Sequence, residues 1–192
     1  MSRSLSIKNE LMRKSIHICN SLFAYSLFFF NQRDFAIAIG ICTIGIILFE
    51  IARVKSRKVS TFFIKIFGPI IRDFEGGGRL TGATYVMVSS FFVLLFFDKY
   101  VCITSILIMS YSDTAAAIIG KMYGKTKIFK KTLEGSLAFF ITSLIIILVM
   151  VPEVNFGLGL VAILAATIVE SLPISIDDNL SVPLIIALIL SI

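Results

Sequence analysis

The chain of 192 residues is 57% hydrophobic and has a mean hydropathy of +0.97, values that exclude a soluble globular domain and indicate an integral membrane protein. Its formal net charge is +6, and its three cysteines are widely spaced within apolar segments, which excludes a cysteine metal site or redox motif. We therefore expect an all-α, polytopic membrane bundle that forms one domain over residues 1–192.

The apolar segments predict about seven helices in the membrane. They run over residues 16–30, 35–52, 80–97, 100–120, 137–151, 157–173 and 182–192. A helix needs about 20 apolar residues to cross a bilayer. The first segment is short, so its helix is expected to begin before His17. The last segment is too short to cross without tilt or local thinning of the bilayer.

The connection over residues 53–79 is basic and is expected to carry an amphipathic helix in the headgroup layer. Its apolar residues keep a helical period, and its basic residues recur at intervals of seven: Val59, Phe62, Phe63, Ile66 and Ile70, with Lys58, Lys65 and Arg72. The three glycines at 76–78 are expected to end this helix.

The lysines and arginines predict the orientation in the membrane. If every segment crosses, 16 of the 18 Lys and Arg residues lie on one side and 2 on the other. The positive-inside rule then places the N-terminus, residues 53–79 and the loop after residue 120 in the cytoplasm. Most acidic residues fall on the same side. Ionisable groups at a membrane are costly, so this clustering predicts a polar site that faces the cytoplasm.

The polar residues that open or close the predicted segments are the candidates for this site. In chain order they include Glu10, Arg13, Lys14, His17, Glu50, Asp113, Glu170, Asp177 and Asp178. Structural alternatives stand beside the functional ones. Glu50 is equally well explained as an ion pair with Arg53, and the two adjacent aspartates as helix-capping residues. His17, taken alone, is more often a hydrogen-bonded histidine than a catalytic one.

The stretch 112–136 has the most unusual combination of residues. Asp113 lies near the end of an apolar segment, and a loop with five lysines follows: Lys121, Lys125, Lys127, Lys130 and Lys131. A carboxylate, small residues and lysines suit a polyanion and its metal ion. The structural alternative is a capping aspartate and a positive-inside flank, with Gly120 and Gly124 as helix-packing residues. A P-loop is excluded, because the glycine spacing is one residue short and no strand is expected before it.

These motifs resemble those of the CTP-dependent polyprenol kinase family, which includes dolichol kinase, phytol kinase and CTP-dependent diacylglycerol kinase. Three groups carry the resemblance: Arg13, Lys14, His17, Arg72, Glu75 and residues 80–85; Asp113, Thr114, Ala115, Ala116, Gly120, Gly124, Lys127 and residues 131–136; Glu170, residues 177–180 and Pro183. The match covers nearly the whole chain in the family's order. The smaller phytol-kinase-like members are nearer than the dolichol kinases, which usually have extra N-terminal spans.

The resemblance implies phosphoryl transfer from CTP to the hydroxyl of a membrane lipid alcohol, with Mg²⁺ held by Asp113 and one or both of Asp177 and Asp178. The phosphates would be bound by glycines and cations: Gly120, Lys121, Gly124, Lys125, Lys127, Lys131 and Arg72. The alcohol proton would pass to one of three side chains: Glu134, Glu170 or His17. The expected partners are the nucleotide, the lipid alcohol (phytol, geranylgeraniol, another polyprenol or diacylglycerol) and membrane lipids, without nucleic acid.

Two other functions remain as alternatives. A phosphatidate cytidylyltransferase, which makes CDP-diacylglycerol, would share a site for CTP and Mg²⁺. A transporter of a lipid phosphate would carry more polar groups at mid-membrane and on the far side than this chain does. The carboxylates near the site would repel an anionic phosphatidate headgroup but suit a neutral alcohol, which favours a kinase.

Overall fold

The computed structural model describes residues 7–68, 71, 80–129, 131–173 and 176–192, and nearly all of its regular structure is helical. The helices are α1 (Ile7–Cys19), α2 (Ser21–Ser26), α3 (Gln32–Lys55), α4 (Arg57–Phe67), α6 (Gly82–Phe96), α7 (Lys99–Leu107), the π-helix η1 (Ile108–Ser112), α8 (Asp113–Tyr123), α9 (Leu133–Met150), α10 (Phe156–Ser171) and α11 (Asp178–Leu190). Strands β1 (Lys127–Ile128) and β2 (Lys131–Thr132) pair as a short antiparallel hairpin. The all-α class expected from the sequence is confirmed.

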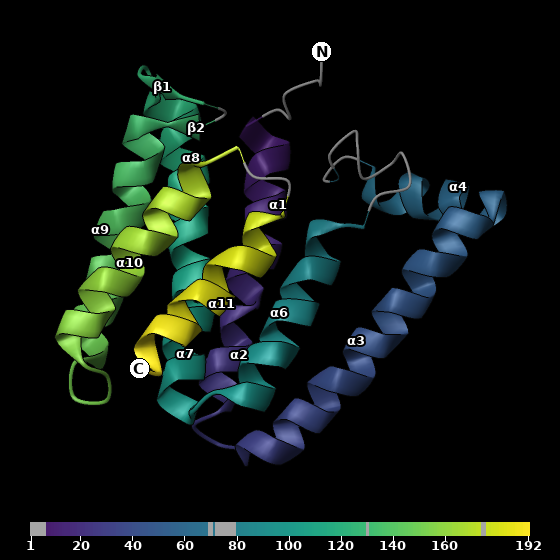
Figure 1. The fold of residues 1–192 in the computed structure, drawn as a ribbon. Coiled ribbons are helices and arrows are strands. Elements are labelled where there is room, and N and C mark those ends of the chain that lie inside the picture. Colours follow the sequence, from purple (N-terminus) through teal and green to yellow (C-terminus); the bar gives the residue numbers. More distant parts are fainter. Residues whose placement is uncertain (1–6, 69–70, 72–79, 130, 174–175) are drawn as a thin grey trace.

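The helices run up and down beside one another, and this alternation brings distant parts of the chain together at one end (Figure 1). The start of α1, the end of α8, the β1–β2 hairpin and the start of α11 all lie at that end. Helix α4 lies at the same end, across the tip of α3. The fold therefore assembles one polar end from segments more than 160 residues apart in sequence.

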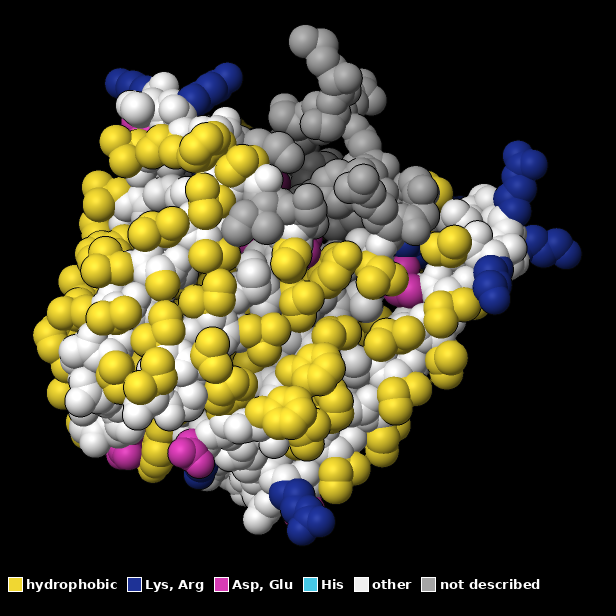
Figure 2. Space-filling view, in the orientation of Figure 1, with side chains coloured by type: hydrophobic (Ala, Val, Ile, Leu, Met, Phe, Trp, Pro, Cys, Tyr) yellow, Lys and Arg dark blue, Asp and Glu magenta, His cyan; other side chains and the backbone are white. Residues whose placement is uncertain are grey.

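Three helices of the described chain are long and apolar enough to cross a membrane: Gln32–Lys55, the continuous stretch Lys99–Tyr123, and Leu133–Met150. Three shorter apolar helices accompany them: Gly82–Phe96, Phe156–Ser171 and Asp178–Leu190. Figure 2 shows hydrophobic side chains over the middle of one face, with lysine and arginine side chains at its margins. This distribution is that of a membrane protein.

The core is apolar and packed around α7 and η1. Fully buried members come from seven elements and include Ala24, Val93, Ile103, Ile106, Ile108, Phe139, Ile147, Ala162, Ile163 and Ile186. Small residues allow helices α8 and α9 to approach closely. A Cβ added to Gly120 would lie 3.4 Å from the Cα of Gly135, and one added to Gly135 would lie 2.9 Å from the carbonyl oxygen of Ala116.

Several expectations differ from the observed elements in detail. The first helix begins at Ile7, before His17 as expected, but it is interrupted at Asn20. The amphipathic helix is confirmed over Arg57–Phe67, whereas its expected continuation and the glycines at 76–78 fall mostly outside the described residues. The fourth segment contains a π-helix that its apolar pattern does not reveal.

Glu50 forms a buried ion pair within α3, and its hydrogen bonds join α3 to the start of α6. Glu50 is 2% exposed and accepts hydrogen bonds from the side chains of Thr81 (2.7 Å) and Thr84 (3.0 Å) and from Arg53 (2.7 Å to Nε). The guanidinium of Arg53 also lies 4.8 Å from the ring centroid of Phe63 in α4. The structural interpretation of Glu50 is the one that the structure supports.

Candidate active site

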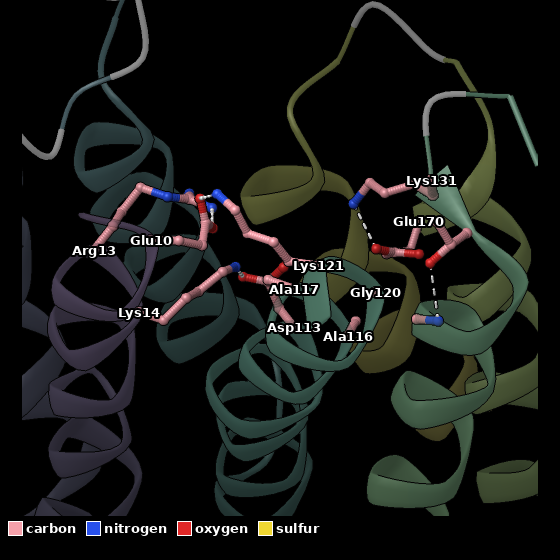
Figure 3. Close-up of a pocket in the computed structure, with 12 residues that line it drawn as sticks. Glu10, Arg13, Lys14, Asp113, Ala116, Ala117, Gly120, Lys121, Lys131 and Glu170 are labelled. Atoms are coloured by element: carbon pink, nitrogen blue, oxygen red, sulfur yellow. Dashed lines mark hydrogen bonds and ion pairs between the residues drawn. The ribbon is translucent and has the colours of Figure 1, made fainter. Parts of the chain in front are cut away.

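A cavity of about 300 Å³ lies at the polar end of the molecule. It is lined by Glu10, Arg13, Lys14, Asp113, Ala116, Ala117, Gly120, Lys121, Lys131, Thr132, Gly135 and Glu170. Figure 3 shows side chains from α1 and α8 on one side of it and Lys131 with Glu170 on the other. Four cations and three carboxylates thus face a space large enough for a phosphate chain.

Asp113 is the first residue of α8 and is held by two side chains of α1. The ammonium of Lys14 donates a hydrogen bond to Oδ2 of Asp113, and Nδ1 of His17 lies 3.4 Å from the same oxygen. Lys14 and His17 are three residues apart, so they share one face of α1. The side chain of Lys14 is only 2% exposed. Asp113 is therefore anchored on its α1 side.

The π-helix η1 immediately before Asp113 is tied to its neighbours through hydroxyl groups. The Ser143 hydroxyl donates to the hydroxyl of Ser112 (2.9 Å), and the Thr114 hydroxyl donates to the carbonyl of Ser110 (2.6 Å). Short π-helices are rare and occur frequently at functional sites. Here the π-helix sets the direction in which α8 presents Asp113.

Lys131, in strand β2, bridges two carboxylates from different helices. Its Nζ atom lies 2.5 Å from Oε1 of Glu170 in α10 and 2.9 Å from Oδ2 of Asp178 in α11. Burial lowers the pKa of Lys131, but the carboxylates of Asp178 and Glu170 raise it by more, so the pKa lies above its usual value. The ammonium is charged at every physiological pH.

Three carboxylates converge at this bridge. Asp113, Glu170 and Asp178 each offer one oxygen atom, and these three atoms lie within 4.8 Å of one another. The second oxygen of Glu170 is buried and has no hydrogen-bond partner among the described residues. Carboxylate oxygens are the ligands that Mg²⁺ prefers. The group therefore fits a divalent cation, and the unpartnered oxygen is an acceptor that such a cation would satisfy.

The rim of the cavity carries a second charged group on α1 and α8. Arg13 lies 2.5 Å from Glu10, whose second oxygen is 4.0 Å from the Nζ atom of Lys121. Burial raises the pKa of Glu10, but Arg13, Lys14 and Lys121 together lower it by more, so the pKa lies below its usual value. Glu10 thus holds Arg13 and Lys121 beside the cavity, and its negative charge offsets part of their positive charge.

The glycines of the lysine-rich stretch fix the hairpin against α8. A Cβ on Gly124 would meet the carbonyl oxygen of Gly120 at 2.1 Å and Thr132 at 2.6 Å. Thr132 caps α9, because its hydroxyl accepts the amide hydrogen of Gly135 at 3.2 Å. Gly120 both lines the cavity and packs against α9. The helix-packing alternative thus describes part of what these glycines do.

The structure brings many of the predicted site residues together. They are His17, Asp113, Gly120, Lys121, Lys131, Glu170 and Asp178. The aspartate pair is divided: Asp178 joins the carboxylate group, whereas Asp177 caps α11 by accepting the amide hydrogen of Asn179 at 3.0 Å. Glu170 stands in the carboxylate group where the sequence pointed to Asp177.

Other predicted residues lie elsewhere. The carboxylate of Glu134 accepts the amide hydrogen of Thr126 at 3.1 Å, and this side chain does not line the cavity. Lys125 and Lys127 are exposed on the hairpin, outside the cavity lining. Arg72, a predicted phosphate-binding residue, lies outside the described residues. The geometry therefore gives Glu134 a structural role in closing the hairpin.

Two contacts could not be identified from the sequence. The sequence marks Lys14 as a polar residue near the first apolar segment, but it does not show that Lys14 contacts Asp113, which is 99 positions away. The bridge from Lys131 to Glu170 spans 39 positions. The helical spacing of Glu10, Lys14 and His17 was the one signal that these side chains share a face.

No family model and no solved structure matches the chain. Over 183 residues it is 31% identical to an uncharacterized protein of Rickettsia prowazekii, covering 91% of this chain and 90% of that protein. Over 141 residues it is 29% identical to CTP-dependent diacylglycerol kinase 1 of Schizosaccharomyces pombe, covering 71% and 64%. Over 119 residues it is 37% identical to probable phytol kinase 2, chloroplastic, of Glycine max, covering 52% and 40%.

The chain thus matches one relative over nearly its full length and spans about two thirds or less of each of the two kinases. The expected resemblance is confirmed, since the named relatives at 27% to 37% identity are CTP-dependent diacylglycerol kinases and phytol kinases. The chain is therefore similar to CTP-dependent lipid kinases over part of their length.

Proposed function

We propose that this protein transfers the γ-phosphoryl group of CTP to the hydroxyl of a membrane lipid alcohol, giving a lipid phosphate and CDP. The new bond joins the alcohol oxygen to the γ-phosphorus, the bond to the β,γ-bridging oxygen breaks, and the alcohol proton leaves. The observation that carries the proposal is the cavity in which three carboxylates and several cations converge, in a chain that is similar to lipid kinases. Phosphoryl transfer depends mainly on such positioning and electrostatic stabilisation.

Asp113, Glu170 and Asp178 are the residues that would hold Mg²⁺. Their oxygen atoms lie close enough for a shared cation, and Glu170 offers an oxygen without a partner among the described residues. When bound, Mg²⁺ would neutralise part of the charge on the nucleotide's phosphates. Lys14 keeps the Asp113 carboxylate ionised and fixed in direction, because the lysine is buried and cannot pair elsewhere without leaving its position on α1.

The phosphates of CTP would lie among the cations that face the cavity. Lys121 and Arg13 line one side and Lys131 the other. Cations on both sides can stabilise the negative charge that spreads over the transferred phosphoryl group in the transition state. Lys127, in strand β1, and Lys125, just before it, are exposed to solvent. Their positive charges would attract the nucleotide.

His17 is the side chain to which we assign the alcohol proton. Glu134 is engaged with the hairpin backbone, and Glu170 belongs to the carboxylate group that suits a cation. Nδ1 of His17 faces Asp113, so a proton on Nδ1 would leave Nε2 as the acceptor. His17 also lies one turn further along α1 than Lys14, away from the polar end, where a lipid hydroxyl would enter.

We further infer that the cavity faces the cytoplasm in a multi-pass chain. The support is the distribution of lysine and arginine residues and the position of the cavity at the lysine-rich end. Cysteine labelling at Lys127 and Asp178 from the cytoplasmic side, and at Glu153 from the other side, tests this orientation. Labelling of Lys127 and Asp178 from opposite sides would contradict a single site.

The decisive experiment follows both possible products of CTP. The protein is purified in detergent or nanodiscs and incubated with labelled CTP, Mg²⁺ and, in separate reactions, phytol, geranylgeraniol, diacylglycerol or phosphatidate. We expect CDP release with a prenyl alcohol and no pyrophosphate. If only diacylglycerol led to CDP release, the lipid substrate would be reassigned and the proposed reaction would stand. Pyrophosphate that depends on phosphatidate would instead identify a cytidylyltransferase.

A further inference from the structure

Two lysines of the described chain pair with the carboxylate group, and they differ in the element that carries them and in their exposure. Lys14 projects from a helix, its side chain is 2% exposed, and its ammonium pairs with Asp113. Lys131 projects from a two-residue strand, its side chain is 34% exposed, and its ammonium pairs with Glu170 and Asp178. The first lysine is enclosed, whereas the second has solvent on one side.

The ammonium of Lys131 contacts oxygen atoms of two of the carboxylates that would hold a metal ion. Glu170 and Asp178 are two of the three residues in the carboxylate group, and Lys131 lies 2.5 Å and 2.9 Å from them. Two cations at such short range repel each other strongly where water is scarce. A divalent cation on these oxygen atoms is therefore incompatible with the observed position of the Lys131 ammonium.

The backbone of the hairpin does not have to move when this side chain does. Thr132, the next residue, is fixed by its capping bond to the amide of Gly135, and Gly120 packs closely against the same turn. The side chain of Lys131 is long and flexible, and its exposed part allows a rotamer change toward the cavity, which Lys131 also lines. Release of the ammonium thus requires side-chain rotation alone.

We propose that Lys131 is an exchangeable counter-ion: a divalent cation displaces its ammonium from Glu170 and Asp178, and the released ammonium then binds a phosphate of the nucleotide. This inference rests on the proposed function, because it assigns a sequence of contacts within the same site. Lys131 neutralises the carboxylates before the substrate arrives and neutralises the substrate afterwards. Lys14 remains on Asp113 throughout.

Displacement of the Lys131 ammonium would make the affinity for the metal depend on the nucleotide, and the affinity for the nucleotide depend on the metal. Without nucleotide, the metal competes with an internal cation and binds weakly. With nucleotide, the released ammonium gains a new anionic partner, so each ligand favours the other to the same extent. The metal and CTP are expected to bind together more tightly than the product of their separate affinities.

The first test measures Mn²⁺ binding to the purified protein by the loss of the free-ion signal in electron paramagnetic resonance. We expect Lys131→Met to bind Mn²⁺ about tenfold more tightly than the wild type in the absence of nucleotide, within the usual range of coupling between sites. Lys65→Met, which removes one exposed lysine on α4, is the matched control and is expected to leave the affinity unchanged. Equal or weaker binding by Lys131→Met would overturn the inference.

The second test uses the wild-type protein and needs no variant to fold. Acetylation of individual lysines is followed by mass spectrometry with and without Mg²⁺. We expect Mg²⁺ alone to raise the reactivity of Lys131 and a non-hydrolysable CTP analogue to lower it again, with Lys14 unreactive throughout and Lys127 unaffected by Mg²⁺ alone. Unchanged reactivity of Lys131 would overturn the exchange. If CDP formation persists in that case, the exchange fails and the kinase function stands.

Discussion

Among the residues that the structure describes, two clusters of charged side chains are buried, and they differ in how many of their carboxylate oxygens accept hydrogen bonds. In the cluster of Glu50, one carboxylate oxygen accepts from the amide of Thr81 and from the hydroxyls of Thr81 and Thr84. The other accepts from two nitrogen atoms of Arg53. In this cluster the guanidinium of Arg53 balances the charge of Glu50, and both carboxylate oxygens accept hydrogen bonds.

The cluster of Glu170 is built differently. Three carboxylates approach within 4.8 Å, two lysines neutralise them, and one oxygen of Glu170 has no partner among the described residues. Buried polar groups are normally satisfied, so an unsatisfied acceptor beside a cavity marks a place where a ligand completes the structure. The comparison supports a structural role for the Glu50 cluster and the proposed binding role for the Glu170 cluster.

The largest effect is expected from Asp113→Asn. Loss of the charge would weaken the cation site and lower turnover by about a hundredfold or more, as the loss of a preorganised electrostatic contact does. CDP release measures turnover, and gel filtration with a thermal unfolding curve checks that the protein is folded. Asp34→Asn, at the exposed start of α3, is the control and is expected to keep full activity. Normal turnover in Asp113→Asn would make the aspartate a purely structural residue.

Arg53→Met tests the other cluster. Removal of one partner leaves the Glu50 charge buried and unpaired, which we expect to lower the free energy of unfolding by about 3 kcal/mol. Unfolding by SDS in mixed micelles measures this change. Turnover per folded molecule should stay close to that of the wild type. If Arg53→Met kept its stability and lost its turnover, the Glu50 cluster would have a functional role, and the contrast with the Glu170 cluster would be wrong.

A smaller effect is expected at the exposed edge of the site. Lys127→Met removes a solvated lysine of the hairpin and should raise KM for CTP about threefold at low salt, with kcat unchanged, because exposed charges contribute little and are screened. Steady-state kinetics at two salt concentrations measure both parameters. A loss of kcat would instead place Lys127 against the transferred group.

The smallest effect is expected from Glu134→Gln. The side-chain oxygen of glutamine can still accept the amide hydrogen of Thr126, so the hairpin should stay closed and turnover should fall no more than about twofold. The same CDP assay measures this. A large loss of turnover in Glu134→Gln would instead assign the role of proton acceptor to Glu134 rather than His17.

The sequence predicted the helices well because their apolar segments are long and locally encoded. It also predicted that the polar groups gather at one end, because lysines and arginines report the orientation of a membrane protein. It could not predict that Lys14 contacts Asp113, since that depends on how two distant helices pack. The hairpin gave no signal either, because Phe129, in its turn, has a φ of 52° without the usual glycine or asparagine.

The choice between Asp177 and Asp178 was similarly open from the sequence. Both are carboxylates at the same end of a helix, and only the start of α11 decides which one caps and which one points to Glu170. Glu170 was a candidate for the alcohol proton, and its position beside Asp178 could be found only from the packing of α10 on α11. Local chemistry identified the residue types, and tertiary packing assigned their roles.

The π-helix before Asp113 has a consequence for how such a site can arise. An α-helix turns by about 100° per residue, so one additional residue within it rotates everything that follows by that angle. The five residues Ile108–Ser112 take up such an offset between α7 and α8. A π-helix takes up one additional residue locally, so an insertion in this stretch can be accommodated without turning Asp113 away from the side chains that it contacts.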